Sequence, residues 1–142
     1  MSYTRTVTVA LPWDEALQST RNALAEQGFG ILTEINVRAT FEAKLGTDAA
    51  DAVGDYVILG ACNPTLASRA LAAEPELGAL LPCNVVVRRG KDANETTIDA
   101  IDPQTMVQLS NSSAVRDVAN DADTRLQAAL ANLSEARSAT DH

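Results

Sequence analysis

The sequence contains almost no histidine, and this absence excludes several kinds of chemistry. Its single histidine, His142, is the last of the 142 residues. Because chain ends are usually poorly ordered, this side chain is not expected to take part in a fixed site. Catalytic schemes that need histidine as a base, such as Ser-His-Asp and Cys-His, are therefore not expected. Metal sites rich in histidine are excluded for the same reason.

Positive charge is also scarce. The chain has 11 Lys and Arg residues against 19 Asp and Glu residues, which gives a net charge of −8. Such a field repels the phosphates of nucleic acids and anionic lipids, so neither nucleic acid nor a membrane is expected as a partner. No apolar run approaches the ~18 residues of a membrane span, and the N-terminus leads into no secretory signal. We therefore expect a cytoplasmic protein.

Aromatic residues make up only 4% of the sequence, so Ala, Val, Leu and Ile must fill the core. A chain of 142 residues is the right length for one domain, and no linker or internal repeat divides it. We expect a single α+β domain over residues 3–134, followed by a polar, frayed tail over 135–142.

Hydrophobic patterning predicts about five strands. Alternating or continuous apolar runs lie at 4–11, 29–37, 55–62, 83–87 and 95–101. The second of these runs predicts one face that carries every other residue from Phe29 to Val37. The third is almost continuously apolar, which predicts a strand buried on both faces.

Helical spacing accounts for most of the remaining chain. Helices are predicted after Pro12, after Asn63-Pro64, after Asp102-Pro103 and after 111–113, because Asn, Asp and Ser cap helices and Pro suits the first turn. Shorter helices are predicted over 39–45 and 76–81. The small, acidic segment 47–54 has no clear period, and it is predicted to be a loop.

Two Cys-Asn pairs stand at the ends of apolar runs. Cys62-Asn63 closes the third run, and Cys83-Asn84 opens the fourth. If the two pairs are adjacent in the fold, their polar groups line a pocket beside the helix that follows Asn63. The exposed amides at the start of that helix suit an anion. Thr65 and Arg69, on the same helix, are further candidates for the pocket rim.

The two cysteines allow three interpretations. They are small apolar core residues at strand ends, or a redox pair, or metal ligands. A cytosolic location disfavours a stable disulfide. Two thiolates without histidine are too few for a closed zinc site, and the C-x-x-C spacing is absent. No cofactor is therefore expected, and metal binding by Cys62 and Cys83 is kept as an alternative.

A small enzyme built on Glu34 or Asp55 is a third possibility. Glu34 lies within an apolar strand, where its neighbours would suit a general acid or base. The simpler interpretation is that it points to solvent. No Gly-rich phosphate loop or nucleophile elbow is present, so a protein without catalytic activity is favoured.

Three runs, in the expected order, resemble the bacterial and archaeal family called domain of unknown function 302. They are GFGILTEI at 28–35, ILGACNP at 58–64 and LLPCNVVV at 80–87. The resemblance covers most of the chain, and it implies an α+β fold of the TATA-binding-protein-like or helix-grip type. It also implies a homodimer. Because that family has no assigned function, no catalytic residue carries over.

The sequence therefore predicts a dimeric, non-catalytic protein that binds a small molecule or anion between its sheet and its helices. The residues expected at the pocket rim are Cys62, Asn63, Thr65, Arg69, Cys83, Asn84 and Glu34.

Overall fold

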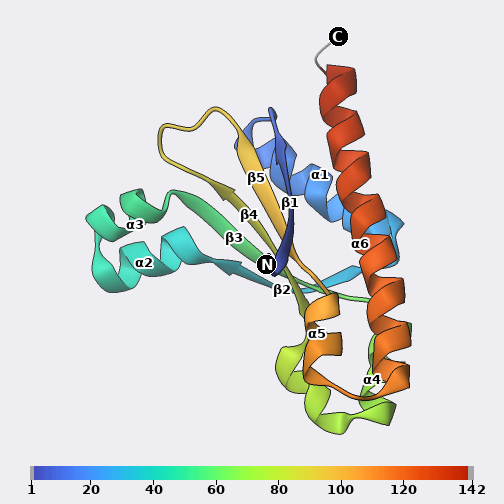
Figure 1. The fold of residues 1–142 in the computed structure, drawn as a ribbon. Coiled ribbons are helices and arrows are strands. Elements are labelled where there is room, and N and C mark those ends of the chain that lie inside the picture. Colours follow the sequence, from blue (N-terminus) through green and yellow to red (C-terminus); the bar gives the residue numbers. More distant parts are fainter. Residues whose placement is uncertain (1, 141–142) are drawn as a thin grey trace.

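A computed structural model describes residues 2–140, with side chains described as far as residue 134. Five strands form one antiparallel sheet in the order β1-β5-β4-β3-β2 (Figure 1). The strands are β1 (Thr4–Val9), β2 (Gly30–Asn36), β3 (Asp55–Cys62), β4 (Cys83–Arg89) and β5 (Thr96–Ile101). The predicted α+β class and antiparallel sheet are confirmed.

The helices gather along one side of the sheet and at its two ends (Figure 1). α2 and α3 form a small lobe at the left of that view, and α4 and α5 lie at the bottom beside α6. The helices are α1 (Trp13–Glu26), α2 (Val37–Leu45), α3 (Thr47–Val53), α4 (Pro64–Ala73), the 3-10 helix η1 (Pro75–Leu80), α5 (Gln104–Leu109) and α6 (Ser113–Thr140). The tail predicted over 135–142 lies outside the described side chains.

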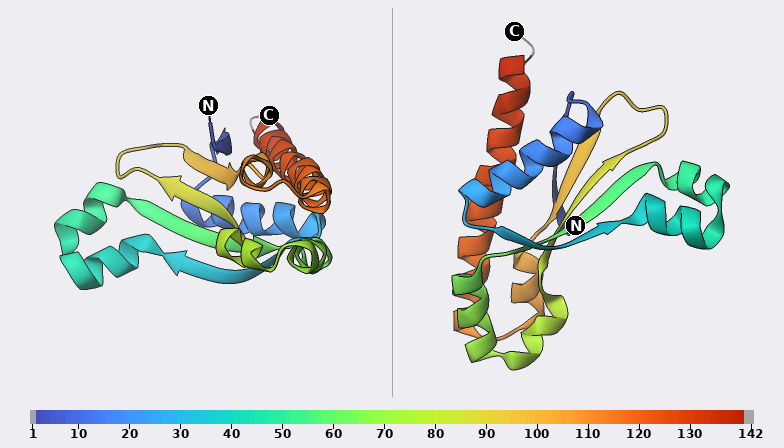
Figure 2. Two further views of the ribbon diagram at one scale, coloured as in Figure 1. Left: turned by 60° about the horizontal axis from the view of Figure 1, so that its bottom comes forward. Right: turned by 180° about the vertical axis from the view of Figure 1, so that it is seen from behind.

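Within the part of the chain that the structure describes, helices cover one face of the sheet and leave the other open. α1 lies across the covered face (Figure 2, right panel), and α6 packs beside it. On β3 the covered face carries Val57, Leu59 and Ala61, which are buried. Tyr56 and Ile58, on the opposite face of β3, are only half-buried. The prediction that this strand is buried on both faces is therefore wrong, because an antiparallel sheet needs a core on one face only.

A β-bulge shifts the faces of β2. Ile31 pairs with Ala61, but the next pair joins Thr33 to Gly60, so Leu32 has no partner in the register. Because successive side chains alternate, one extra residue moves the rest of the strand to the opposite face. Ile31 therefore lies on the covered face and Ile35 on the open one. The prediction that both share one face is wrong.

The segment predicted to be a loop at 47–54 contains helix α3. Gly46 and Gly54 bound this helix, and both have positive φ angles, of 96° and 73°. Arg38 on α2 donates hydrogen bonds to the Ala50 carbonyl and to the Asp51 carboxylate of α3, at 3.1 and 2.7 Å. These contacts from another helix stabilise a short segment whose own pattern is weak.

The long helix α6 connects two groups of buried residues. One half of its apolar stripe packs against the sheet and α1, and the other half packs against α4 and α5. The apolar residues that recur every three or four positions along this helix are all buried: Val115, Val118, Ala122, Leu126, Ala129 and Leu133. Among the described residues, no helix combines the length and the hydrophobicity needed to cross a membrane.

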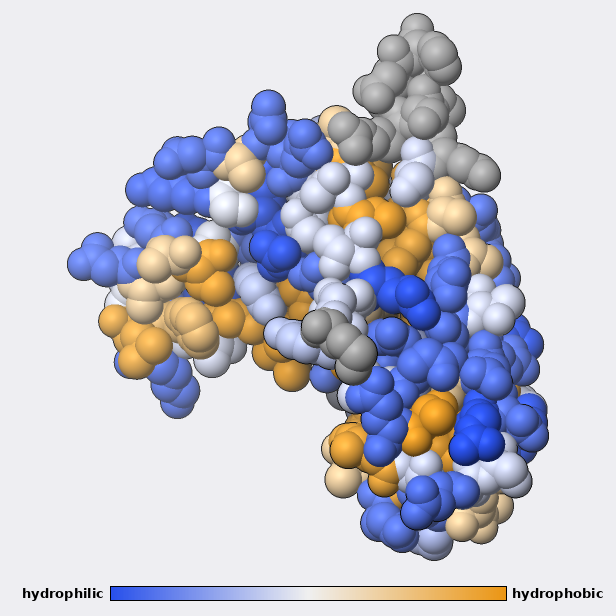
Figure 3. All heavy atoms as spheres, viewed as in Figure 1, coloured by the Kyte–Doolittle hydropathy of each residue, from blue (hydrophilic) through white to orange (hydrophobic). Residues whose placement is uncertain are grey.

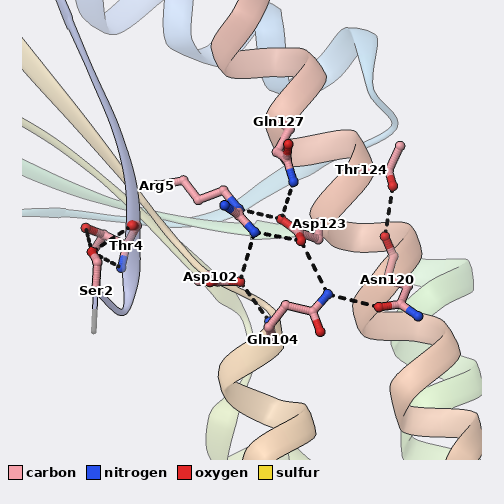
Figure 4. Close-up of polar contacts among 9 residues, drawn as sticks. All are labelled: Ser2, Thr4, Arg5, Asp102, Gln104, Asn120, Asp123, Thr124 and Gln127. Atoms are coloured by element: carbon pink, nitrogen blue, oxygen red, sulfur yellow. Dashed lines mark hydrogen bonds and ion pairs between the residues drawn. The ribbon is translucent and has the colours of Figure 1, made fainter.

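A polar network holds α6 against β1 and α5 (Figure 4). Arg5 on β1 donates two hydrogen bonds to the Asp123 carboxylate, at 2.6 and 2.9 Å. Gln104 on α5 and Gln127 on α6 donate to the same carboxylate, at 3.3 and 3.0 Å. Asp102 accepts from the Gln104 backbone N–H at 2.9 Å. The network fixes the part of α6 that lies over the candidate site.

Candidate functional site

The two Cys-Asn pairs lie side by side in the fold. In the register of β3 and β4, Ala61 pairs with Cys83 and Gly60 pairs with Asn84. Cys62 is the next residue of β3, so both cysteines lie at the same end of the two strands. α4 begins immediately after β3, and β4 is reached through η1. The chain therefore forms a closed corner around the start of α4.

A small cavity, called here the thiol cavity, lies in this corner. Its volume is about 30 Å³, within a hollow of about 390 Å³ that includes space open to solvent. Cys62, Asn63 and Cys83 line it, and the rest of the lining is apolar. The apolar residues are Phe29, Ala61, Leu66, Ala67, Ala70, Leu81, Pro82, Met106, Val118 and Ala122.

Asn63 has the predicted capping role. Its side-chain oxygen accepts a hydrogen bond from the Leu66 N–H at 3.1 Å. Pro64 has no N–H, and the Leu66 N–H is bonded to Asn63. In the first turn of α4 the N–H that is left for a ligand is therefore that of Thr65. A helix terminus binds anions through several free amides. The start of α4 is therefore better suited to an uncharged ligand than to an anion.

The two thiols of the cavity differ in exposure. Cys62 is half-buried and Cys83 is buried, and both are free. Burial, together with the nearby Cys62, raises the pKa of the Cys83 thiol to about 11. Because the thiolate is the reactive form and the metal-binding form, Cys83 is a neutral, weakly reactive group near pH 7. Among the described residues, no group of three or more His, Cys, Asp and Glu side chains is arranged to hold a metal ion.

The structure brings only some of the predicted rim residues to the thiol cavity. Cys62, Asn63 and Cys83 line it, whereas Thr65 and Arg69 are exposed on α4 and do not. Asn84 is exposed and lines a separate hollow of about 220 Å³ beside η1. Glu34 is exposed on β2, where Arg21 of α1 forms an ion pair with it.

The apolar walls of the thiol cavity are not identified by the sequence as site residues. Met106 lies on α5, and Val118 and Ala122 lie on α6 at helical spacing that is typical of a buried apolar face. That periodicity shows which face of a helix is buried, but it does not show where the packing leaves a gap. The cavity becomes recognisable only from the three-dimensional structure, in which residues of α4, α5 and α6 meet the ends of β3 and β4.

Comparisons with known proteins agree with this architecture. The family model described as "Domain of unknown function DUF302" matches residues 5–133. The chain is also similar to a solved structure, an uncharacterized conserved DUF302 protein from Bacillus stearothermophilus. The TM-score is 0.80 and the identity is 29%, over 92% of this chain and 97% of that chain. No curated protein matches the chain.

Proposed function

The chain belongs to the DUF302 family, and from this premise we propose that it is a homodimeric, non-catalytic binding protein with an apolar ligand. The ligand, or its apolar end, occupies the thiol cavity. The observation that carries this proposal is the lining of the cavity, in which ten apolar residues surround two cysteines and Asn63. Cytoplasmic location remains an expectation from the sequence.

The lining and the size of the thiol cavity restrict the ligand. A charged group would lose its hydration and gain few partners, because most of the lining is apolar, the Asn63 oxygen caps α4 and the Cys83 thiol is neutral. The cavity volume of about 30 Å³ exceeds the roughly 10–15 Å³ that one water molecule needs. It therefore admits a few atoms, such as the end of an alkyl chain, while the rest of the ligand lies at the mouth.

A thermal-shift experiment with 1-hexanol as probe tests this proposal. At saturating concentration we expect the melting temperature to rise by roughly 3–6 °C, because a ligand that binds only the folded chain stabilises it. Ala67 lines the cavity, so in Ala67→Leu the larger side chain takes up part of its volume and the shift should disappear. In the matched control Ala72→Leu, on the exposed side of α4, the shift should remain.

Two results would contradict the apolar-ligand proposal. One is an equal shift in the wild type, Ala67→Leu and Ala72→Leu, which would place the alcohol elsewhere. The other is no shift in the wild type with 1-hexanol, indole or benzene, which together sample chain-like and ring-like shapes.

The homodimer is supported by unpaired apolar surface at one edge of the sheet. β2 is an edge strand, so one side of its backbone has no strand partner among the described residues. Leu32 and Ile35 on β2 are 64% and 49% exposed, and Leu45 on α2 is 67% exposed. α2 has no buried residue, and hydrophobic atoms gather over the α2–α3 lobe (Figure 3). A second copy that pairs along β2 would cover both elements.

Cysteine-based redox chemistry or metal binding is the second candidate, because both thiols line one cavity. Oxidation with diamide tests the redox form. A bridge between Cys62 and Cys83 would remove two hydrogen atoms from the chain, which transfer to diamide, and mass spectrometry would detect the loss. Elemental analysis of the purified protein tests the metal form. If the mass is unchanged and the protein contains no metal, both forms of this second candidate are contradicted, and the apolar-ligand proposal remains.

A further inference from the structure

A second hollow, called here the sheet-face hollow, lies on the open face of the sheet. Its volume is about 410 Å³, which is within the roughly 300–1,000 Å³ typical of small-molecule pockets. No residue is shared between its lining and that of the thiol cavity. Its lining includes Tyr3, Thr4, Tyr56, Val86, Arg88 and Asp99.

The register of the sheet places four of these side chains together. Tyr56 on β3 pairs with Arg88 on β4, and Val86 on β4 pairs with Asp99 on β5. Val86 and Arg88 are two residues apart, so all four side chains lie on one face. The segment before β1 adds a wall through Tyr3. The site is therefore built on the rigid centre of the sheet.

Arg88 is held in position by Asp99 of β5, which is itself held by Thr6 of β1. Its Nε donates to Oδ2 of Asp99 at 2.6 Å. The other oxygen of Asp99 accepts from the Thr6 hydroxyl at 2.7 Å. Because both oxygens of the carboxylate are engaged, Asp99 cannot turn away without losing a hydrogen bond. The guanidinium is consequently fixed before any ligand arrives.

The guanidinium keeps most of its hydrogen-bonding capacity. Its two Nη atoms carry four of its five N–H groups, and they make no hydrogen bond to the residues that the structure describes. The Arg88 side chain is 48% exposed. Tyr56, its partner across the strand pair, lines the same hollow and carries a phenolic hydroxyl that can donate a hydrogen bond. Two parallel N–H groups on one guanidinium match the two oxygens of a carboxylate.

We propose that the sheet-face hollow binds a small monocarboxylate with an apolar or aromatic body. The carboxylate takes the free Nη groups of Arg88 and the Tyr56 hydroxyl, and the body lies over Val86 against the Tyr3 ring. Asp99 already balances one unit of positive charge, and the chain as a whole carries a charge of −8. Ligands with several negative charges, such as polyphosphates, are therefore repelled.

Isothermal titration of the 142-residue chain with phenylacetate and hexanoate tests the site. Each acid is compared with its primary amide, which has the same shape but no charge. We expect at least one acid to bind with a Kd of about 1 mM or lower, and its amide to bind at least about tenfold more weakly. Arg88→Gln should weaken binding of that acid at least about tenfold, and Tyr56→Phe roughly three- to tenfold.

Two control variants test whether the acids bind at this hollow and not elsewhere on the protein. Arg116→Gln, an equal change of charge at an exposed position of α6, should leave the affinity unchanged. Ala67→Leu should also leave it unchanged, because that variant fills the thiol cavity and not this hollow. Circular dichroism melts of all variants establish that each one is folded.

Three outcomes would overturn the proposal. They are equal binding of acid and amide, unchanged affinity in folded Arg88→Gln, and no acid bound more tightly than about 1 mM. A loss of dimer in Arg88→Gln without any binding of the acids would assign the hollow to a second copy instead. None of these outcomes bears on the thiol cavity, so the two proposals fail independently.

Discussion

Asp123 shows how one buried carboxylate joins three elements of the fold. Burial alone would raise the pKa of its carboxyl above the ordinary value of 3.8, but hydrogen bonds from Arg5, Gln127 and Gln104 outweigh burial and lower it. The same contact with Asp123 raises the pKa of Arg5. The charged pair is thus stabilised as a unit, and its removal leaves a half-buried guanidinium without a counter-charge.

We expect Asp123→Asn to lower the free energy of unfolding by about 1–2 kcal/mol at pH 7, a range reduced because Arg5 is partly exposed to solvent. Urea denaturation measures this quantity. The control is Asp121→Asn, which breaks the more exposed pair with Arg125 on the same helix and should cost about 0.5 kcal/mol or less. Equal decreases in the free energy of unfolding in both variants would show that the network of Asp123 stabilises the fold no more than an exposed ion pair does.

The same group predicts a dependence on pH. Because the pKa of Asp123 is lower in the folded chain, its contribution is complete above the ordinary value of 3.8 and is lost as the pH falls through the folded pKa. The stability difference between the wild type and Asp123→Asn should therefore be constant from about pH 5 to 7 and shrink below about pH 4. A difference that grows on acidification would contradict the assignment.

Cys83 gives a second prediction at the residue scale. With a pKa of about 11 instead of 9.0, the thiolate fraction at pH 8 falls roughly 100-fold. In Cys62→Ser, Cys83 is the only thiol, and its burial, the larger cause of the raised pKa, remains while the contribution of Cys62 is removed. We therefore expect reaction with Ellman's reagent to be at least about tenfold slower in the folded chain than in urea. Fast reaction in the folded variant would show that Cys83 is accessible and ionised, and it would favour the redox candidate.

At the scale of elements, the α2–α3 lobe depends on two glycines in different surroundings. Both have positive φ angles, which disfavour any other residue. A Cβ at Gly54 would lie 2.5 Å from the Arg89 carbonyl oxygen, whereas a Cβ at Gly46 would have nothing within 4 Å. The strain of positive φ is common to both sites, but the clash with backbone occurs only at Gly54.

We therefore expect Gly46→Ala to lower the free energy of unfolding by about 1–3 kcal/mol, the cost of a backbone conformation (φ 96°, ψ 176°) that essentially only glycine adopts. Gly54→Ala should cost about 3 kcal/mol or more, since a β-strand backbone must move to admit the methyl group. Urea denaturation of the two variants provides the comparison. Similar decreases in the free energy of unfolding would mean that the loop after β4 moves to make room for the methyl group at little cost.

Elements that carry their own local signal were predictable from the sequence. Asn63 followed by Pro64 identified the start of α4, and the capping bond from Leu66 confirms it. Gly28, directly after the C-cap of α1, is a local signal of the same kind, and its φ of 85° explains the preference for glycine. In both cases the physical cause lies within a few residues of chain.

Features that depend on distant contacts were not predictable. The bulge at Leu32 depends on how β2 pairs with β3, and no local pattern marks it. Helix α3 depends on Arg38 from the preceding helix. For the site, the two Cys-Asn pairs pointed to the right corner, but several walls of the cavity come from α5 and α6, which lie much further along the chain.

At the scale of the whole molecule, the two edges of the sheet differ in how far other elements cover them. β1 forms one edge and contacts α6, which is also held there by the pair of Arg5 and Asp123. β2 forms the other edge, and all but one of its residues are exposed. An open strand edge with exposed leucine and isoleucine promotes association between copies unless charge or a covering element prevents it. This asymmetry places the expected dimer contact along β2 and α2.

Sedimentation equilibrium of the wild type should give the mass of two 15.0 kDa chains at micromolar concentration. We expect Leu32→Lys to shift this to the mass of one chain, because a charge on the edge strand opposes pairing with a second copy. Leu109→Lys is the matched control, since Leu109 on α5 is 67% exposed and Leu32 is 64% exposed. It adds the same charge at a position remote from β2 in the fold, so this variant should remain dimeric. A wild-type chain that sediments as a monomer would refute the homodimer, and a dimer that persists in Leu32→Lys would move its contact away from β2.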